Sequence, residues 1–457
     1  MSTAPQTAAL SGRKKAIGHR SLAIGEAAKP PAAMGHESQN TSSPEGAKEM
    51  RGLPSGWRWA RMNEVCSRVQ DGTHFSPKEQ TRTGDFKYIT AKNIKHWGLD
   101  LSHLTYVPER VHREIYRRCN VEKGDVLYIK DGVTTGIATV NTLGEEFSLL
   151  SSVALLKPRR DILDSLFLKY YLNSSEGFRN MTGQMTGTAI KRLILQKIKA
   201  AVVPVAPLSE QRRIVAEIEK QFTRLEAGVA ALRRVQANLK RYRAAVLKSA
   251  CEGRLVASDL SAWKRLKVSE IGEVVTGNTP PTSDKGNLGD ELPFFKPTDL
   301  DAGYNVREAR QYLSTKGSKL ARVLPAGSVL VTCIGATIGK TGFARVDCAT
   351  NQQINALVVN PKVATPEWAF WSFRSPDGQQ QIKNNASATT LPIPNKSKFE
   401  ALEVPLPPLA EQTRIVSEVE RRLSVVEELE AVVSANLQRA TRLRQSILQK
   451  AFTGELS

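Results

Sequence analysis

Two long stretches of the chain place apolar residues at the spacing of a coiled coil. In each stretch one apolar series recurs every seven residues, and a second series fills the companion position of the heptad. A seam sustained over about four heptads predicts a long helix that packs against another helix. The first seam comprises Ile218, Leu225, Leu232, Leu239 and Val246, with Val215, Phe222 and Val229 beside them. The second comprises Val419, Val426, Val433, Ala440 and Ile447, with Val416, Leu423 and Leu437 beside them.

Local signals predict where these helices begin and end. Pro207 and Pro408 lie just before the two seams, and Ser209 is a suitable N-cap for the first helix. Gly253 and Gly454 follow the last turns, where glycine commonly accepts the left-handed backbone of a helix end. The first helix then has ~43 residues and a length of ~65 Å.

The chain is built twice. "PLSEQRRIVAEIEKQFTRLEA" (207–227) matches "PLAEQTRIVSEVERRLSVVEE" (408–428), and the ungapped match continues to the two glycines with about a third of the positions identical. This similarity is far above the level expected by chance and indicates an internal repeat. Upstream, "KGDVLYIKDGVTTGIATV" (123–140) corresponds to "AGSVLVTCIGATIGKTGF" (326–343), and Trp57 corresponds to Trp263.

The segments before the helices have another character. Short apolar runs broken by Gly, Asp and Asn predict strands and turns, and 164–179 and 367–383 predict short helices. The fold class is therefore α+β, with two tandem mixed α/β domains, each followed by a long helix. The predicted divisions are a disordered basic tail (1–51), domain 1 (52–206), helix 1 (207–254), domain 2 (255–406) and helix 2 (407–457).

Chain connectivity predicts the direction of the helices. Helix 1 carries the chain from domain 1 to domain 2, so helix 2, which starts at domain 2, must run back to pair with it. We expect an antiparallel coiled coil with approximate two-fold symmetry and a domain near each end. The alternative is that each helix packs only on its own domain.

Composition favours a polyanionic partner. The 65 Lys and Arg residues outnumber the 45 Asp and Glu residues, for a net charge of +20, and nucleic acid is the commonest partner of such a surplus. No apolar run is long enough to span a membrane, and no secretory signal is evident, so we expect a cytoplasmic protein. The scattered cysteines, and His96, His103, His112 and Cys119, match no common zinc spacing, so no metal site is expected.

Catalytic motifs are not found. "GATIGKTG" (335–342) resembles a phosphate-binding loop, but Gly335 and Gly339 are one residue too close, and strand-like sequence follows where a helix is required. We therefore expect a turn between two strands. There is no S-adenosylmethionine loop, and Asp71 with Asp85 and Lys87 fits only loosely the layout of a Mg²⁺-dependent nuclease.

These features together resemble the specificity subunits of type I restriction–modification enzymes. The resemblance covers roughly residues 52–457 and rests on "PLSEQRRIVAEIE", "PLAEQTRIVSEVE", "LPSGW" (53–57), "DGTH" (71–74) and "NQQINAL" (351–357). It implies a non-catalytic subunit with two target-recognition domains, each reading one half of a bipartite, asymmetric site on double-stranded DNA. Two modification subunits would supply S-adenosylmethionine-dependent adenine methylation, and restriction subunits would supply ATP- and Mg²⁺-dependent translocation and cleavage. No cofactor is expected in this chain.

Polar loops after predicted strands are the candidate DNA contacts, because side chains in such loops can reach phosphates and groove edges. They are Thr73, His74, Lys78, Lys92 and Asn93 in domain 1, and Asn278, Thr279, Lys296 and Thr298 in domain 2. Ordinary turn chemistry is the alternative for each of them. Asn351, Gln352 and Gln353 suit adenine edges, but a structural turn is favoured there.

The helices carry further candidates. Arg241 and Arg243 correspond to Arg442 and Arg444 in the repeat. Contact with phosphates or with a partner is predicted for all four, and the alternative is that they are only cations suited to a helix C-terminus. The resemblance implies that the helices bind the modification subunits, with candidate contacts at Glu210, Gln211, Arg213, Glu411, Gln412 and Arg414. The competing functions are an autonomous nuclease or methyltransferase, disfavoured by the missing motifs, and a structural adaptor, disfavoured by the charge and the two domains.

Overall fold

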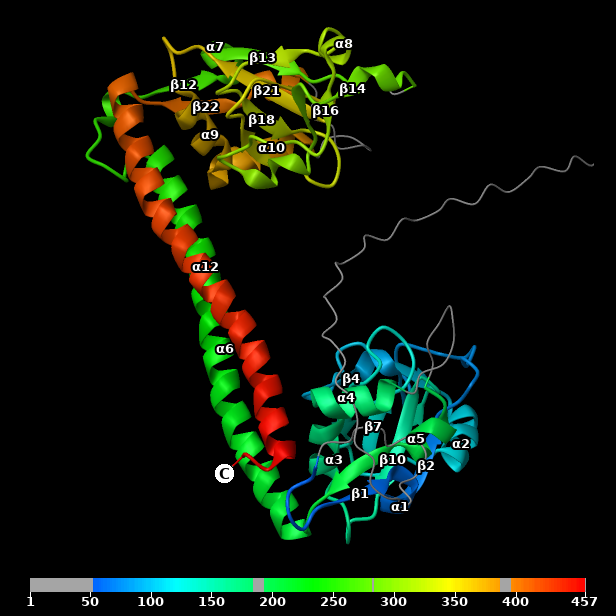
Figure 1. Ribbon diagram of the computed structural model, residues 1–457. Helices are drawn as coiled ribbons and strands as arrows, with labels where there is room; N and C mark the ends of the chain where they lie inside the picture. The colour runs from blue at the N-terminus through cyan, green and yellow to red at the C-terminus, as the bar shows by residue number, and fades with distance from the viewer. Residues whose placement is uncertain (1–51, 184–192, 282, 387–395, 457) are drawn as a thin grey trace, which may run out of the picture. The chain divides into compact units, whose positions relative to one another are not determined.

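The computed structural model describes residues 52–183, 193–281, 283–386 and 396–456. The predicted basic tail, residues 1–51, lies outside this range. Two mixed α/β domains each lead into a long helix, α6 (Leu208–Cys251) after domain 1 and α12 (Leu409–Thr453) after domain 2 (Figure 1). With 44 and 45 residues, these helices are ~66 Å long.

Domain 1 is organised around a four-stranded antiparallel sheet in the order β2-β10-β7-β8. A second sheet, β6-β3-β9, lies beside it, and β1 pairs with β11. The elements are β1 (Arg58–Arg61), α1 (Met62–Val65), β2 (Cys66–Asp71), β3 (Phe86–Ile89), η1 (Ala91–Asn93), β4 (Ile94–Lys95), β5 (Gly98–Leu99), β6 (Thr105–Val107), α2 (Glu109–Arg118), β7 (Val126–Ile129), β8 (Ala138–Val140), β9 (Ser148–Leu149), β10 (Val153–Pro158), α3 (Ser165–Leu172), α4 (Ser175–Thr182), α5 (Leu195–Ala200) and β11 (Val202–Val205).

Domain 2 repeats the plan with the sheet β13-β21-β18-β19, a five-stranded sheet β14-β16-β15-β20-β17 and the pair β12-β22. The elements are η2 (Leu260–Ala262), β12 (Lys264–Lys267), α7 (Val268–Ile271), β13 (Gly272–Thr276), η3 (Lys285–Asn287), β14 (Leu288–Gly289), β15 (Leu292–Phe295), η4 (Asp299–Ala302), β16 (Tyr312–Leu313), α8 (Thr315–Ser318), β17 (Val323–Leu324), β18 (Val329–Thr332), β19 (Thr341–Phe343), β20 (Cys348–Thr350), β21 (Ile354–Val359), α9 (Pro366–Arg374), α10 (Pro376–Ala386), α11 (Lys396–Glu400) and β22 (Glu403–Leu406).

Each of the two predicted short helices is interrupted by a serine. Ser174 and Ser375 cap α4 and α10: each hydroxyl donates to a carbonyl of the preceding helix and accepts the N–H of Gly177 or Gly378. The repeat therefore extends to a helix–cap–helix motif that apolar periodicity does not reveal.

The two long helices are antiparallel, and each domain core contains parts of both (Figure 1). The domain 1 core includes Ile214 and Ile218 from the start of α6, and Leu448 and Phe452 from the end of α12. The ring of Phe452 lies 5.1 Å from that of Phe167. The domain 2 core takes the end of α6 and the start of α12 in the same way. The predicted coiled coil is confirmed, and packing of each helix on its own domain accompanies it.

Two repeat-related ion pairs fix the register of the helices. Arg444 lies 3.1 Å from Glu226, and the equivalent Arg243 lies 3.7 Å from Glu427. Arg243 also lies 3.0 Å from Glu430. Both guanidinium groups therefore join the helices to each other, and contact with phosphate or a partner stays a prediction for Arg243 and Arg444. Arg241 and Arg442 are exposed, so their predicted role is untouched.

The start of each long helix is locked to its own domain by a buried glutamine. Gln211 accepts the N–H of Asp164 at 2.8 Å and donates to the carbonyls of Ile162 and Ala206. Gln412 makes the same three bonds, to Thr365, Val363 and Pro407. Both side chains are 0% exposed. The prediction that they contact a partner is wrong, because no polar atom of either faces the surface.

The other predicted partner contacts at the starts of the long helices have two different locations. Some lie on the surface, and others contact the segment that connects the two domains. Glu411 accepts the indole N–H of Trp263, and Arg414 donates to the carbonyl of Ala257, so both fasten that connection to α12. Glu210 and Arg213 lie 3.9 Å apart on α6, and Arg213 is exposed. These two retain their predicted partner role.

The predicted helix ends are partly correct. Gly253 and Gly454 adopt left-handed φ values of 66° and 79°, as expected. Ser209 is not the N-cap of helix 1. The N-cap is Pro207, two residues earlier, and its carbonyl accepts the N–H groups of Glu210 and Gln211.

Removing one glutamine lock should destabilise its domain. Gln211→Leu leaves one N–H and two carbonyls without partners at a buried site, so we expect a loss of about 2–5 kcal/mol in urea unfolding. The exposed neighbour Arg212→Ala should cost less than about 0.5 kcal/mol. Equal effects of the two substitutions would contradict the role assigned to Gln211.

Candidate nucleic-acid interface

Each four-stranded sheet has one end at which the loops gather, which we call the loop end. In domain 1 the pairing of Ala154 with Asp71 and of Val153 with Ile129 places the loop after β2, the β7–β8 turn and the start of β10 together. In domain 2, Thr276 pairs with Asn355, and Thr332 pairs with Ile354. The parallel pairs β3–β9 and β15–β20 bring the loops after β3 and β15 to the same ends.

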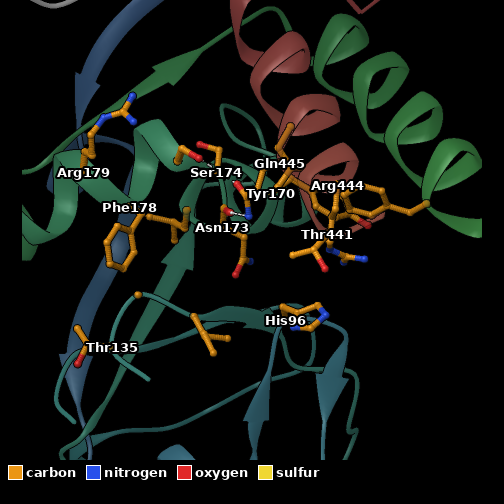
Figure 2. A pocket seen from close by; sticks show the side chains of 16 residues that line it. His96, Thr135, Tyr170, Asn173, Ser174, Phe178, Arg179, Thr441, Arg444 and Gln445 are labelled. Atoms are coloured by element: carbon orange, nitrogen blue, oxygen red, sulfur yellow. Dashed lines mark hydrogen bonds between the residues drawn. The ribbon is translucent and has the colours of Figure 1, made fainter. Parts of the chain in front are cut away.

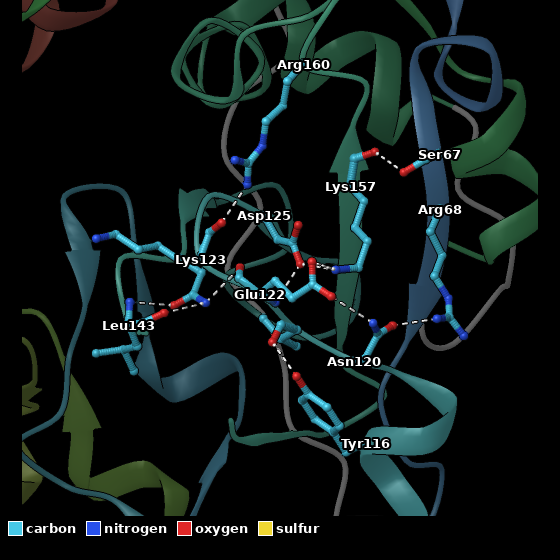
Figure 3. A network of polar contacts seen from close by, with 12 residues as sticks. Ser67, Arg68, Tyr116, Asn120, Glu122, Lys123, Asp125, Leu143, Lys157 and Arg160 are labelled. Atoms are coloured by element: carbon cyan, nitrogen blue, oxygen red, sulfur yellow. Dashed lines mark hydrogen bonds and ion pairs between the residues drawn. The ribbon is translucent and has the colours of Figure 1, made fainter. Parts of the chain in front are cut away.

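A polar network closes the opposite end of the domain 1 sheet (Figure 3). Lys157 lies 2.8 Å from Asp125 and 3.2 Å from Glu122, and Arg160 donates to the carbonyl of Lys123. These groups therefore bind one another across this end of the sheet.

The loop end of domain 1 gathers the predicted DNA contacts but does not leave all of them free. His74, Lys78 and Lys92 are exposed, and His74 lies 3.3 Å from Asp71. Thr73 is only 4% exposed and bonds the backbone of Phe75. Asn93 is also 4% exposed: its amide donates to the carbonyls of Asp100 and His103 and accepts from Thr90. Turn chemistry therefore accounts for Thr73 and Asn93.

Domain 2 shows the same division. Thr279 and Thr298 are exposed, and the Lys296 ammonium lies 5.8 Å from the ring centre of Phe294. Asn278 uses both ends of its amide, toward the carbonyl of Leu320 and the N–H of Arg322. Among the described residues, Lys296 and Thr298 are thus the candidates whose side chains make no hydrogen bond, while Asn278 shapes the loop and the Thr279 hydroxyl donates to Gln352.

The "NQQ" segment forms the expected turn before β21. Asn351 and Gln353 bond each other, and the carbonyl of Gln353 accepts the N–H of Cys333. Gln352 accepts a hydrogen bond from Thr279 at 2.7 Å. The structural interpretation is confirmed for Asn351 and Gln353.

A cleft of about 530 Å³ lies between domain 1 and the end of α12 (Figure 2). Its lining includes His96, Thr135, Tyr170, Arg179 and Arg444. Burial, assisted by Arg444 and Lys169, lowers the pKa of His96. The cleft is therefore lined by two arginines, one of which, Arg444, is already paired with Glu226.

The equivalent seam in domain 2 is filled by an aromatic side chain. The hydroxyl of Tyr304 donates to Glu420 of α12, and its ring contacts those of Phe370 and Trp371. In domain 1 the equivalent Glu219 is 3.4 Å from Tyr170 instead. Sequence reasoning missed this asymmetry, because Tyr304 lies in a segment that aligns only loosely.

The loop that resembles a nucleotide site is a turn between strands. It joins β18 to β19, with no helix after it, and Lys340 lies 2.6 Å from Asp301. The nuclease-like layout also fails: Asp71 pairs with Arg118 at 2.9 Å, and Lys87 pairs with Glu145 at 2.7 Å. Among the described residues no cluster of three His, Cys, Asp or Glu could hold a metal ion. In the same part of the chain, no helix combines the length and apolarity needed to cross a bilayer.

Comparisons with known proteins agree on one family. The model of the type I restriction modification DNA specificity domain matches residues 54–231 and 261–432. The EcoKI specificity subunit of Escherichia coli (strain K12) is 24% identical over 427 residues, covering 89% of this chain and 90% of that protein. The StySPI specificity subunit of Salmonella potsdam is 22% identical, with the same coverage.

Solved structures share the fold. A chain from work on complex assembly and conformational transition of a type I R-M system has a TM-score of 0.69 at 22% identity, covering 89% of this chain and all of that one. The HsdS subunit from Thermoanaerobacter tengcongensis has a TM-score of 0.51 at 21% identity, covering 90% of this chain and 99% of that one.

The turn at Lys340 should not bind nucleotide. A ligand at a hundred times its Kd stabilises a protein by about 2.7 kcal/mol, which shifts the melting temperature measurably. We expect no shift on adding ATP and Mg²⁺ to the purified chain, whether wild type or Lys340→Ala. A shift in the wild type that Lys340→Ala abolishes would contradict this interpretation.

Proposed function

The chain belongs to the type I restriction–modification DNA specificity family, and we propose that its two domains read the two halves of one bipartite, asymmetric DNA site. The observation that carries this proposal is the pair of loop ends, one per domain, with different exposed side chains. Each domain shares its core with both ends of the antiparallel helix pair. Two readers joined in this way suit two short tracts separated by a gap that is not read.

The chain recognises DNA sequence and is not itself an enzyme. We assign the chemistry to partner subunits: adenine methylation with S-adenosylmethionine to two modification subunits, and translocation and cleavage with ATP and Mg²⁺ to restriction subunits. Because the complex would act on the host's own DNA, we expect it in the cytoplasm.

Exposed apolar side chains on the long helices support the binding of partner subunits there. Val425, Leu429 and Val432 lie on one stretch of α12 and are 45–55% exposed. Tyr242 on α6 and its repeat equivalent Leu443 on α12 are 45% and 51% exposed. An apolar groove between the helices includes Leu225, Leu232 and Leu443. Apolar surface of this kind is typical of protein interfaces, and the internal repeat supports two modification subunits.

The helices would determine the gap between the half-sites. A length of ~66 Å corresponds to about nineteen base pairs at ~3.4 Å per pair. The spacing should then follow helix length, while each half-site follows its own domain.

Lengthening both helices tests this proposal. Four residues inserted after Ala231 and four after Val432 add ~6 Å, or nearly two base-pair steps, with a rotation of only about forty degrees. We expect methylation of the same half-sites with a gap one or two pairs longer, read by sequencing methylated DNA. Replacing residues 52–206 by a related domain should change one half-site alone. If the lengthened protein assembles but methylates the original spacing, the helices do not set the gap.

DNA binding by the assembled complex should depend steeply on salt. If six to eight phosphates are neutralised, log K should fall against log salt with a slope of roughly −5 to −7. The measurement is a titration of a labelled duplex at several salt concentrations. A slope near zero would mean that the basic surplus does not serve phosphate binding.

A further inference from the structure

The β7–β8 turn of domain 1 and the β18–β19 turn of domain 2 are exposed and have the same backbone conformation. Gly132, Thr134 and Gly136 correspond to Gly335, Thr337 and Gly339. All four glycines have φ between 88° and 108°, so the two turns share a left-handed backbone that other residues rarely adopt. Both turns lie at the loop ends, beside the loops that carry the exposed candidates for DNA contact.

The tips of these turns have no role in the packing of their own domains. Val133 is 107% exposed, and Thr134 and Thr337 are exposed as well. Within the described residues, neither threonine hydroxyl makes a hydrogen bond, and the N–H groups of Thr134 and Thr337 make none either. Each tip therefore presents free donors on a backbone that is already ordered.

The turns are also held in place. The N–H of Gly136 bonds the carbonyl of Ile129, and that of Gly339 bonds the carbonyl of Thr332. A Cβ on Gly136 would lie 2.5 Å from the ring of Phe178, and one on Gly339 would lie 2.7 Å from Gln379. Phe178 and Gln379 occupy equivalent positions on α4 and α10, so each helix supports its turn.

What two readers of different sequences have in common is the sugar–phosphate backbone of DNA. Side chains that read bases must differ between the halves of an asymmetric site, whereas phosphate contacts carry no sequence information and can be identical. Backbone N–H groups in a left-handed turn, with a hydroxyl beside them, are suited to an anionic oxygen. In domain 1 the turn also borders the cleft lined by Arg179 and Arg444 (Figure 2).

We propose that the turns at 132–136 and 335–339 each bind a DNA phosphate, by the same contacts in both half-sites. The resemblance of residues 335–342 to a nucleotide loop then reflects phosphate binding without nucleotide chemistry. This inference rests on the proposed function, since it requires that both loop ends face DNA.

A negative charge at each tip tests the inference in the complete complex with its modification subunits. Val133→Asp and Ala336→Asp place a carboxylate beside the bound phosphate. Because like charges a few ångströms apart repel, we expect each to weaken binding about tenfold, or ~1.4 kcal/mol. The loss should be equal for the target duplex and a scrambled duplex, with unchanged methylated half-sites. The matched controls are Asn63→Asp on α1 and Ser269→Asp on α7. Both residues are exposed and occupy equivalent positions in the repeat. Each lies just before the first strand of its four-stranded sheet, β2 or β13, at the end opposite the loop end. Both control variants should therefore bind within twofold of wild type.

Three results would overturn the inference. Unchanged affinity in both tip variants would show that the turns do not approach DNA. A loss for the target duplex alone would show that they read bases. Dissociation of a modification subunit in size-exclusion chromatography would show that they are protein contacts. If the wild-type complex itself fails to prefer any duplex, the proposed function fails instead.

Discussion

The antiparallel contact between α6 and α12 is the constraint on which the rest of the structure depends. Each domain core is completed by the start of its own helix and by the end of the other, as Ile218 and Phe452 do for domain 1. The Arg444–Glu226 and Arg243–Glu427 pairs fix one register, and each glutamine fixes a helix start to its domain. Because two rigid helices join the two cores, the loop ends are held by packing and not by a linker.

Much of this architecture was predictable because the sequence contains an internal repeat. The heptad pattern predicts the two long helices. The internal repeat and the order of its parts along the chain predict that these helices pair in antiparallel fashion. The Arg–Glu ion pairs between the helices could also have been predicted, since both partners are identical in the two copies of the repeat. They were not, because arginines near a helix end also suit contact with phosphate. Gln211 was misread because a polar side chain in a shared motif resembles a binding residue, and only burial identifies it as a lock. The prediction that Ser209 caps helix 1 was wrong, because a backbone carbonyl can take the place of a side-chain cap.

The candidate site was less predictable than the fold. Loop residues after strands were located correctly at the loop ends, but sequence could not separate free side chains such as Lys78 from those bonded within the loop, such as Asn93. That distinction depends on contacts between segments far apart in the chain. The repeat helps here in a second way: what differs between the loop ends suits the reading of bases, and what is identical suits a shared task.

The most direct test of the central claim is the map of methylated adenines in DNA modified by the wild-type complex. If two domains held by one helix pair read two tracts, the map should contain a single bipartite motif, with different halves and a gap of constant length. A continuous motif, two identical halves or a gap of variable length would contradict this account.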